Sequence, residues 1–414
     1  MRLNRIPART GGACRVLGAL LAALLALGMG PPARATRVMV VSDLHYMAPA
    51  LYADSDLFLR VLRAGDGKLT QYGDTLMDAL RETVLRQRPD ALLVTGDLAF
   101  NGERESHEAL AKRFADIEES GVPVWVIPGN HDINVSTARR FDGDGWSYTQ
   151  TVSPEEYRAI YRDFTCPAAE DAGANLSCLV RVDDRLWVAM VDAAFYRGEA
   201  QTFGVFTADH AAWLEQAMRE AGDVELITAS HHSLLPHTEF SRDSYVMLGN
   251  SAMLALDQKY GARLHLSGHL HIQHMADQGG VTDAALGAFC TWPHRYALVT
   301  LGDDGSLEYA AMSLDEALLP EGFMAMSRAW FADIAGAKAR ASLPEGTEDI
   351  EALADYAARF NLAYFAGTYR SDDPAWKADP AYALWQRQAD SLFGQYMRLV
   401  MDEPNGENLR RVWR

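Results

Sequence analysis

The chain has 414 residues, and its charged and hydrophobic fractions of 23% and 49% are those of a soluble globular protein with length for one large domain or two. The formal net charge of −18 excludes a general binder of DNA or RNA, because contacts to nucleic-acid phosphates require a surplus of Lys and Arg.

The first 35 residues differ from the rest of the chain. Four arginines precede an uncharged apolar run from Val16 to Met29, and a small-residue triplet follows at 33–35. This order predicts a secretory signal peptide at 1–35, and therefore an exported protein that is periplasmic or secreted. An uncleaved N-terminal membrane anchor is the alternative, although the apolar run is short for a bilayer span. Cleavage would remove five arginines and no acidic residue, which takes the net charge to −23 and leaves no stable membrane span.

Three cysteines follow the predicted cleavage site. Cys166 and Cys178 flank a polar loop, and in an oxidising compartment they form either a local disulfide or two free thiols. Their spacing does not decide between the two. Cys290, beside Phe289 and Trp292, is predicted to be a small buried apolar residue.

Short runs rich in Val, Ile and Leu predict buried strands up to about residue 300. In chain order they are Val38–Val41, Ala91–Val94, Val124–Ile127, Leu186–Val191, Leu226–Thr228 and Arg263–Leu266. Apolar residues at helical spacing predict helices around 76–85, 110–117 and 213–218. Strands that alternate with helices predict an α/β fold with functional groups at strand ends.

After about Leu314 the pattern changes. Glycine becomes less frequent than in the preceding residues, and helical patterns rich in aromatic residues take over, as at Ile350–Tyr364 and Ala381–Val400. These aromatic side chains need burial, so we expect the segment to pack on the α/β domain or to form a small bundle. The predicted division is a signal peptide at 1–35, an α/β domain at 36–314 and a C-terminal helical domain at 315–414.

Potential metal ligands follow five of the predicted strands. They are Asp43 and His45 in SDLH, Asp97 in GD, Asn130 in GNHD, His231 in HH, and His269 and His271 in GHLH. Carboxylate, amide and imidazole donors without thiolate suit Mn, Fe, Zn or Co better than Ca or a structural zinc. The sequence therefore predicts a centre for two divalent metal ions, a type of site that serves in-line phosphoryl displacement.

The ordered motifs DLH, GD, GNHD, HH and GHLH between residues 37 and 300 resemble those of the calcineurin-like metallophosphoesterase superfamily. The continuation GDLAFNGE and the His pair are most similar to its cyclic-nucleotide phosphodiesterase-like (class III) branch, in which some exported bacterial members carry a helical C-terminal extension. The fold that this resemblance implies is a sandwich of two mixed β-sheets flanked by helices.

The resemblance also implies a role for each motif residue. One metal ion would be held by Asp43, His45, Asp97 and His271, and the other by Asp97, Asn130, His231 and His269, with Asp97 bridging the two. His131 would be no ligand; it would stabilise the transition state and protonate the leaving oxygen. Between the paired histidines, His231 is preferred over His232.

Several other polar residues near these motifs are expected to be structural. Asp132 is predicted to cap a turn rather than to orient His131. We expect His107 on the surface of a helix, His210 beside a helix cap and His265 as a satisfied core histidine. Asn101 is the one candidate for contact with a phosphate oxygen, and the substrate-binding residues are otherwise unknown.

The predicted activity is hydrolysis of phosphodiesters, such as cyclic nucleotides or other small diesters, by direct attack of a metal-bridging hydroxide. The alternative is a phosphomonoesterase with the same metal centre: a nucleotidase, an acid phosphatase or a protein phosphatase. A binding module that keeps only the fold would be expected to lack ligands, and none is missing. The expected partner is a small phosphoester substrate, with no long nucleic acid.

Overall fold

The computed structural model describes residues 35–52, 55–166, 176–240, 245–388, 391–403 and 406–414. The predicted signal peptide lies outside these residues except for its last position, Ala35. Among the described helices, none has both the length and the apolar character that crossing a bilayer requires.

The six predicted strands and the three helices predicted before Leu314 are present. The strands are β1 (Thr36–Val41), β2 (Ala91–Thr95), β3 (Val124–Ile127), β4 (Arg139–Asp142), β5 (Gly145–Tyr148), β6 (Cys178–Arg181), β7 (Leu186–Val191), β8 (Glu225–Ser230), β9 (Leu264–Ser267), β10 (His274–Gln278), β11 (Val281–Ala285), β12 (Arg295–Leu301), β13 (Leu307–Ser313) and β14 (Arg410–Trp413). The helices are α2 (Asp56–Ala64), α3 (Gly73–Gln87), α4 (Arg104–Glu118), α5 (Pro154–Ile160), α6 (Ala208–Ala221), α7 (Asn250–Tyr260), α8 (Phe323–Ser342), α9 (Ile350–Phe365), α10 (Pro374–Ala378), α11 (Pro380–Trp385) and α12 (Leu392–Val400). Short 3-10 turns occur at η1 (Pro49–Leu51), η2 (Thr70–Tyr72) and η3 (Glu316–Leu318).

Two mixed six-stranded sheets form the centre of the molecule. Their strand orders are β14-β13-β12-β1-β2-β3 and β10-β11-β9-β8-β7-β6, and β4 and β5 form a separate two-stranded ribbon. Strands β1, β2 and β3 run parallel, as do β7, β8 and β9. The expected sandwich of two mixed sheets is confirmed.

Side-chain alternation along β1 explains how the first sheet is covered on both faces. Val38 and Val40 pack into the core between the sheets, together with Ile227 and Leu264 of the second sheet. Met39 and the other outward residues of β1 pack into the core beneath α3 and α4. Because successive strand residues point to opposite faces, a near-continuous apolar strand is what a sheet buried on both sides requires.

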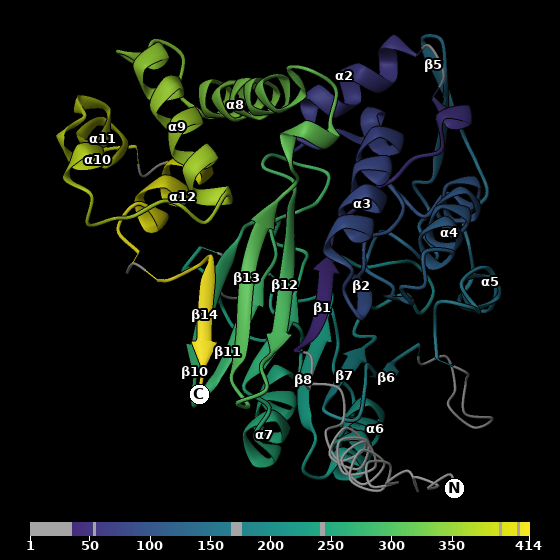
Figure 1. Cartoon of the computed structure of the whole chain (residues 1–414). Coiled ribbons are helices and arrows are strands. Elements are labelled where there is room, and N and C mark those ends of the chain that lie inside the picture. The colour runs from purple at the N-terminus through teal and green to yellow at the C-terminus, as the bar shows by residue number, and fades with distance from the viewer. Residues whose placement is uncertain (1–34, 53–54, 167–175, 241–244, 389–390, 404–405) are drawn as a thin grey trace, which may run out of the picture.

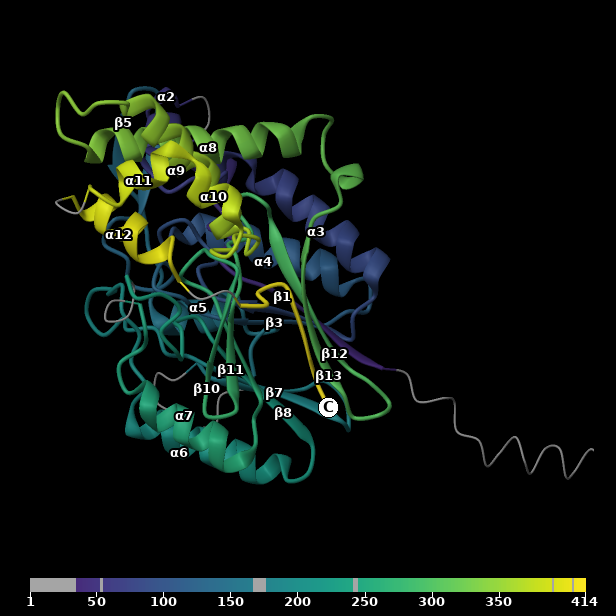
Figure 2. The same cartoon turned by 90° about the vertical axis from the view of Figure 1, so that its left-hand side faces the viewer.

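The helices lie outside the two sheets. A third apolar core joins the second sheet to α6 and α7, and a fourth lies within the C-terminal helices. In both views α6 and α7 are at one end of the molecule and α8, α9 and α12 are at the other (Figures 1 and 2). Strand β1 points towards the latter group, so its carboxyl end faces the C-terminal helices (Figure 1).

The C-terminal segment differs from the prediction in two respects. The stretch from Ala381 to Val400, which reads as one helical pattern, contains two helices, α11 and α12. The chain then returns to the first sheet, where β14 pairs antiparallel with β13. The prediction of a wholly helical segment did not include this strand, because residues 410–413 carry the strand-like pair Val412 and Trp413 among arginines rather than an apolar run.

Cys166 and Cys178 form a disulfide with a Cα–Cα distance of 5.1 Å, which decides the question that their spacing left open. Cys290 is free and 1% exposed, as predicted for a buried apolar residue. His107, however, was wrongly expected at the surface. It is fully buried, and its ring nitrogens lie 2.9 Å from the Tyr161 hydroxyl and 3.0 Å from the Asp132 carbonyl oxygen.

Candidate metal centre

The predicted site residues follow the carboxyl ends of five strands. Asp43 and His45 follow β1, Asp97 follows β2, Asn130 and His131 follow β3, His231 follows β8, and His269 and His271 follow β9. Because β1–β3 are mutually parallel, as are β8 and β9, these ends meet at one edge of each sheet. Asp43 joins the two edges, since its carboxylate accepts from the His269 amide at 3.1 Å.

The backbone is strained at most of these positions. Positive φ angles occur at Asp43 (57°), His45 (39°), Asp97 (49°), His269 (68°) and His271 (60°). This region is uncommon for residues other than glycine, and such strain is concentrated at functional sites. The turns bring each side chain over the sheet edge instead of continuing the strand.

Four of the predicted ligands form the first cluster. Donor atoms from Asp43, His45, Asp97 and His271 all lie within 4.8 Å of one another. His45 Nε2 is 3.5 Å from Asp97 Oδ2, and His271 Nε2 is 3.3 Å from Asp43 Oδ1. These are the same four residues that the resemblance assigned to one metal ion.

The second cluster shares Asp97 with the first. Donor atoms of Asp97, His231 and His269 lie within 4.8 Å of one another. His231 Nε2 lies 3.3 Å from Asp97 Oδ2 and 3.1 Å from Asn130 Oδ1, which brings the amide to the same point. All seven predicted ligands are thus brought together, with Asp97 between the two groups.

Two observations indicate that these residues fit metal ions. His269 Nε2 is buried and has no hydrogen-bond partner among the described residues, although a buried polar atom ordinarily finds one. Burial lowers the pKa of His231, but the Asp97 carboxylate offsets this effect and raises the pKa to about 9. Burial also lowers the pKa of His271, but the Asp43 carboxylate outweighs this effect and raises the pKa to about 9. The negative field at both clusters favours bound cations.

Two motif glycines are required by close packing at this edge. A Cβ atom on Gly129 would lie 2.2 Å from Asp97 Oδ1, and one on Gly268 would lie 1.9 Å from Ser42 Oγ. Any side chain at these positions would push a ligand loop away from its neighbour. The glycines of GNHD and GHLH therefore permit the two sheet edges to approach each other.

His131 lies beside the clusters and is fixed by its neighbours. Its amide donates to Asp97 Oδ1 at 2.8 Å, and its Nδ1 lies 3.0 Å from both the Phe100 carbonyl oxygen and Asn101 Oδ1. A carbonyl oxygen only accepts, so Nδ1 carries the hydrogen and Nε2 is the nitrogen left for proton transfer. Asn101, predicted as a phosphate contact, instead bonds His131.

The neighbouring polar residues behave mostly as predicted. Asp132 is fully buried and accepts from the amides of Ala99 and Gly129, so its role is structural. His232 Nε2 lies 3.0 Å from the Thr202 carbonyl oxygen, and its ring packs on that of His269 with centroids 4.5 Å apart, but it adds no donor atom to either cluster. His265 bonds Thr228 and Ser230 in the core, and His210 forms a capping box with Thr207 at the start of α6.

Two charged residues at the site were not predicted. Asp66 Oδ2 lies 3.3 Å from His271 Nδ1, on the side of the ring opposite the cluster, and 3.3 Å from Lys68 Nζ. Although burial acts to raise the pKa of Asp66, Lys68 and His271 hold it well below its usual range. Asp66 and Lys68 follow the helix α2 rather than a strand, so the pattern of polar residues at strand ends does not include them.

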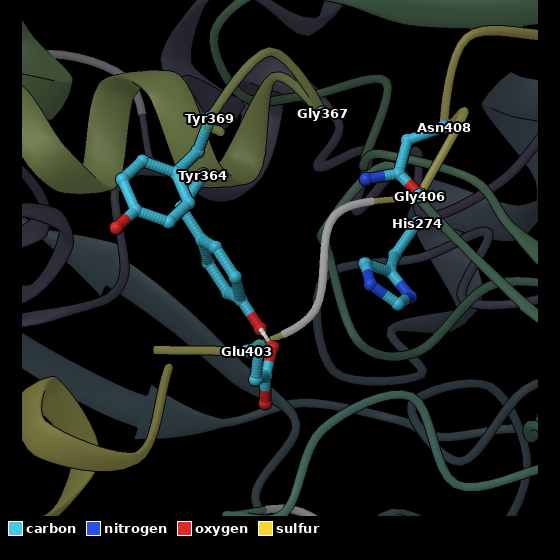
Figure 3. A pocket seen from close by; sticks show the side chains of 7 residues that line it. All are labelled: His274, Tyr364, Gly367, Tyr369, Glu403, Gly406 and Asn408. Atoms are coloured by element: carbon cyan, nitrogen blue, oxygen red, sulfur yellow. Dashed lines mark hydrogen bonds between the residues drawn. The ribbon is translucent and has the colours of Figure 1, made fainter. Parts of the chain in front are cut away.

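The clusters open into a cleft of about 300 Å³. Besides ligands and His131, it is lined by side chains that include Phe240, Ile272, Tyr364, Phe365 and Tyr396. The last three belong to α9 and α12, so the C-terminal segment forms part of the wall. A second, small cavity of about 20 Å³ is also lined by Tyr364, whose hydroxyl points to Glu403 and donates to Oε2 at 3.0 Å (Figure 3).

Comparison with protein families gives two matches. The family model described as calcineurin-like phosphoesterase matches residues 36–273, and the model described as the C-terminal domain of cyclic nucleotide phosphodiesterase matches residues 313–406. The first match covers more than half of the chain and includes every predicted ligand. The second covers the C-terminal helices.

Individual relatives are more distant. The glycerophosphodiester phosphodiesterase GpdQ of Enterobacter lignolyticus (strain SCF1) is 25% identical over 205 residues, which are 49% of this chain and 64% of that protein. A probable cyclic nucleotide phosphodiesterase of Moraxella catarrhalis (strain BBH18) is 21% identical over 198 residues, or 47% and 63%. The matched region is thus under two thirds of each relative. A dimetal phosphatase from Danio rerio, 14% identical with a TM-score of 0.51 over 68% of this chain and 96% of that one, shares the fold.

Proposed function

This chain belongs to the calcineurin-like phosphoesterase family of metal-dependent phosphoester hydrolases, and from that premise we propose that it hydrolyses small phosphodiesters, cyclic nucleotides among them. The observation that carries the proposal is the convergence of seven donor side chains on two clusters that share Asp97. Bound there, two divalent metal ions supply positive charge that activates water and neutralises phosphoryl oxygens.

The residues of the chain divide the remaining work. The seven ligands would hold the two metal ions, whose positive charge would bind the reacting phosphoester. His131 Nε2, when protonated, delivers that proton to the ester oxygen as the P–O bond breaks, while Nδ1 keeps its own hydrogen on the Phe100 carbonyl oxygen. The proton that the attacking water gives up restores Nε2 for the next turnover. The product alcohol leaves neutral, and the phosphoryl group keeps the oxygen of the attacking water.

A direct attack by water, without a phosphorylated enzyme, is supported by the serines beside the ligands. The Ser230 hydroxyl donates to the His232 carbonyl oxygen at 2.6 Å, and the Ser267 hydroxyl donates to Asp283 at 2.7 Å. Both are fully buried and engaged in these bonds. Neither is free to attack phosphorus.

The preference for diesters is supported by the printed names of the relatives, which include glycerophosphodiester and cyclic nucleotide phosphodiesterases. Export to the periplasm or the medium is part of the proposal, supported by the basic, apolar and small-residue order at 1–35 and by the disulfide Cys166–Cys178. The acidic balance of −18 supports a small substrate over a long nucleic acid.

The test compares rates on bis(p-nitrophenyl) phosphate and p-nitrophenyl phosphate with added Mn²⁺, for the wild type and Asn130→Ala. We expect the wild type to prefer the diester, and Asn130→Ala to lose most turnover because it weakens one metal site. A monoester preference by a large factor would show instead the second candidate, a phosphomonoesterase of the nucleotidase, acid phosphatase or protein phosphatase kind.

A further inference from the structure

The cleft beside the metal centre has a second kind of wall that no step of the hydrolysis uses. The ligand side contributes carboxylate, amide and imidazole groups, whereas the C-terminal helices contribute Tyr364, Phe365 and Tyr396. Phe240, from the loop after β8, packs against Tyr396 with ring centroids 5.3 Å apart. We call Phe240, Tyr364, Phe365 and Tyr396 the aromatic wall.

The polar groups of the aromatic wall are already engaged. The Tyr364 hydroxyl donates to Glu403 at 3.0 Å (Figure 3), and the Tyr396 hydroxyl donates to Asn361 at 2.5 Å. Phe240 and Phe365 have no polar group to offer. The wall therefore presents ring surface rather than hydrogen-bonding groups, and it fits a flat apolar group.

The charges around the cleft argue against a cationic group at this wall. The two carboxylates that line the cleft are Asp66 and Asp97. Asp66 pairs with Lys68, and Asp97 belongs to the metal clusters. A quaternary ammonium group could contact the rings, but it would find no carboxylate among the lining residues that is free to balance its charge. A neutral planar ring needs no such partner.

From these observations we infer that the C-terminal helices build a subsite for the non-reacting part of the substrate, and that this part is a nucleobase. The inference rests on the proposed function, which supplies the phosphodiester at the metal centre. Stacking of a base on aromatic side chains is favourable and tolerant of base identity, because every base has a π-face. Selection between substrates then resides in the C-terminal segment rather than at the metals.

The experiment uses two substrates with the same reacting bond: cyclic 3′,5′-adenosine monophosphate and ribose 3′,5′-cyclic phosphate without a base. We expect wild-type kcat/KM to be at least about tenfold higher with the base present. The double variant Phe240→Leu, Phe365→Leu keeps apolar volume but removes two rings, and the ratio should fall towards one. The control Tyr148→Leu changes an exposed ring on β5 that packs on Trp146 and does not line the cleft, and it should keep the ratio.

Three results would overturn the subsite: equal kcat/KM for the two substrates in the wild type, an unchanged ratio in the double variant, or a preference for glycerophosphocholine over the cyclic nucleotide. Adenosine binding, measured by calorimetry, separates this inference from the proposed function. Absence of hydrolysis of every diester, with adenosine still bound by the wild type and about tenfold more weakly by the double variant, would end the proposed function and keep the subsite. Failure to bind adenosine would end the subsite alone.

Discussion

The Nε2 atoms of His45 and His271 lie 3.2 Å apart, although 226 residues separate the two histidines in the chain. Asp66 accepts from Nδ1 of His271 on the far side of that ring, so Nε2 is the His271 nitrogen that faces His45. Two imidazole nitrogens held this closely, beside Asp43 and Asp97, define a position where a cation is favoured. The metal binding and the activity expected of the protein depend on how such pairs of side chains are held in place.

Asp66→Asn should weaken metal binding. The carboxylate orients His271 and strengthens it as a donor, and loss of such a partner ordinarily costs about 10–100-fold in metal affinity. Titration with Mn²⁺ against a competing chelator measures this without reference to turnover. Asp78→Asn, a change in an exposed ion pair with Arg113, is the matched control. Equal Mn²⁺ affinities for the wild type and Asp66→Asn would contradict the role of Asp66 in supporting His271 as a ligand.

His131→Ala should keep the metal ions and slow the reaction. His131 contributes no donor atom to either cluster, and general acid catalysis typically contributes about 10²–10⁴-fold. The loss should be largest for alkyl esters and small for nitrophenyl esters, whose leaving groups need no proton. Metal content by mass spectrometry and kcat on both ester types check this, with His210→Ala as control. Equal losses on the two ester types would argue against the acid role.

Gly129→Ala should disrupt the centre while the fold persists. The added Cβ would lie 2.2 Å from Asp97 Oδ1 and 2.4 Å from the Asp97 amide nitrogen, so the bridging carboxylate must move. Misplacement of about 1 Å can cost about 100-fold in rate. Metal content and kcat report the effect, and circular dichroism reports the fold. Gly145→Ala, whose nearest neighbour atom lies at 3.6 Å, should behave as wild type. Full metal content and turnover in Gly129→Ala would contradict the packing argument.

Glu103→Gln should change the pH dependence of stability. Glu103 is fully buried, one of its oxygens has no hydrogen-bond partner among the described residues, and burial raises its pKa from 4.5 to about 7. Between these values the folded protein holds a proton that the unfolded chain releases. The stabilisation is therefore complete below about pH 4.5 and is lost as the pH rises to 7.

The free energy of unfolding of the wild type should thus fall by about 3 kcal/mol, relative to that of Glu103→Gln, between pH 4.5 and pH 8. Urea unfolding of both proteins in the presence of a chelator, at several pH values, measures the difference. A difference that does not vary with pH would show that Glu103 is ionised in the folded state. Taking the difference between the two proteins cancels the contribution of the metal-ligand histidines.

The ligands were predictable because each stands directly after an apolar strand, and parallel strands bring their ends to one edge. Asp66 was not predictable in this way. It lies in the loop after α2, and only the folded chain brings that loop next to His271. His107 was misread because periodicity identifies the apolar face of a helix, whereas burial of a polar residue depends on partners such as Tyr161. The aromatic residues after Leu314 indicated burial, but which of them face the cleft is set by tertiary packing.

The return of the chain to the first sheet has a consequence for how such enzymes diversify. Strands β13 and β14 are neighbours in the sheet, and the whole run of α8–α12 leaves from one and comes back to the other. The run is therefore an insertion that is anchored at both ends to neighbouring strands of one sheet. Replacement of this insertion by one of different length or composition would change which substrates fit the cleft. The loops that carry the metal ligands would stay the same.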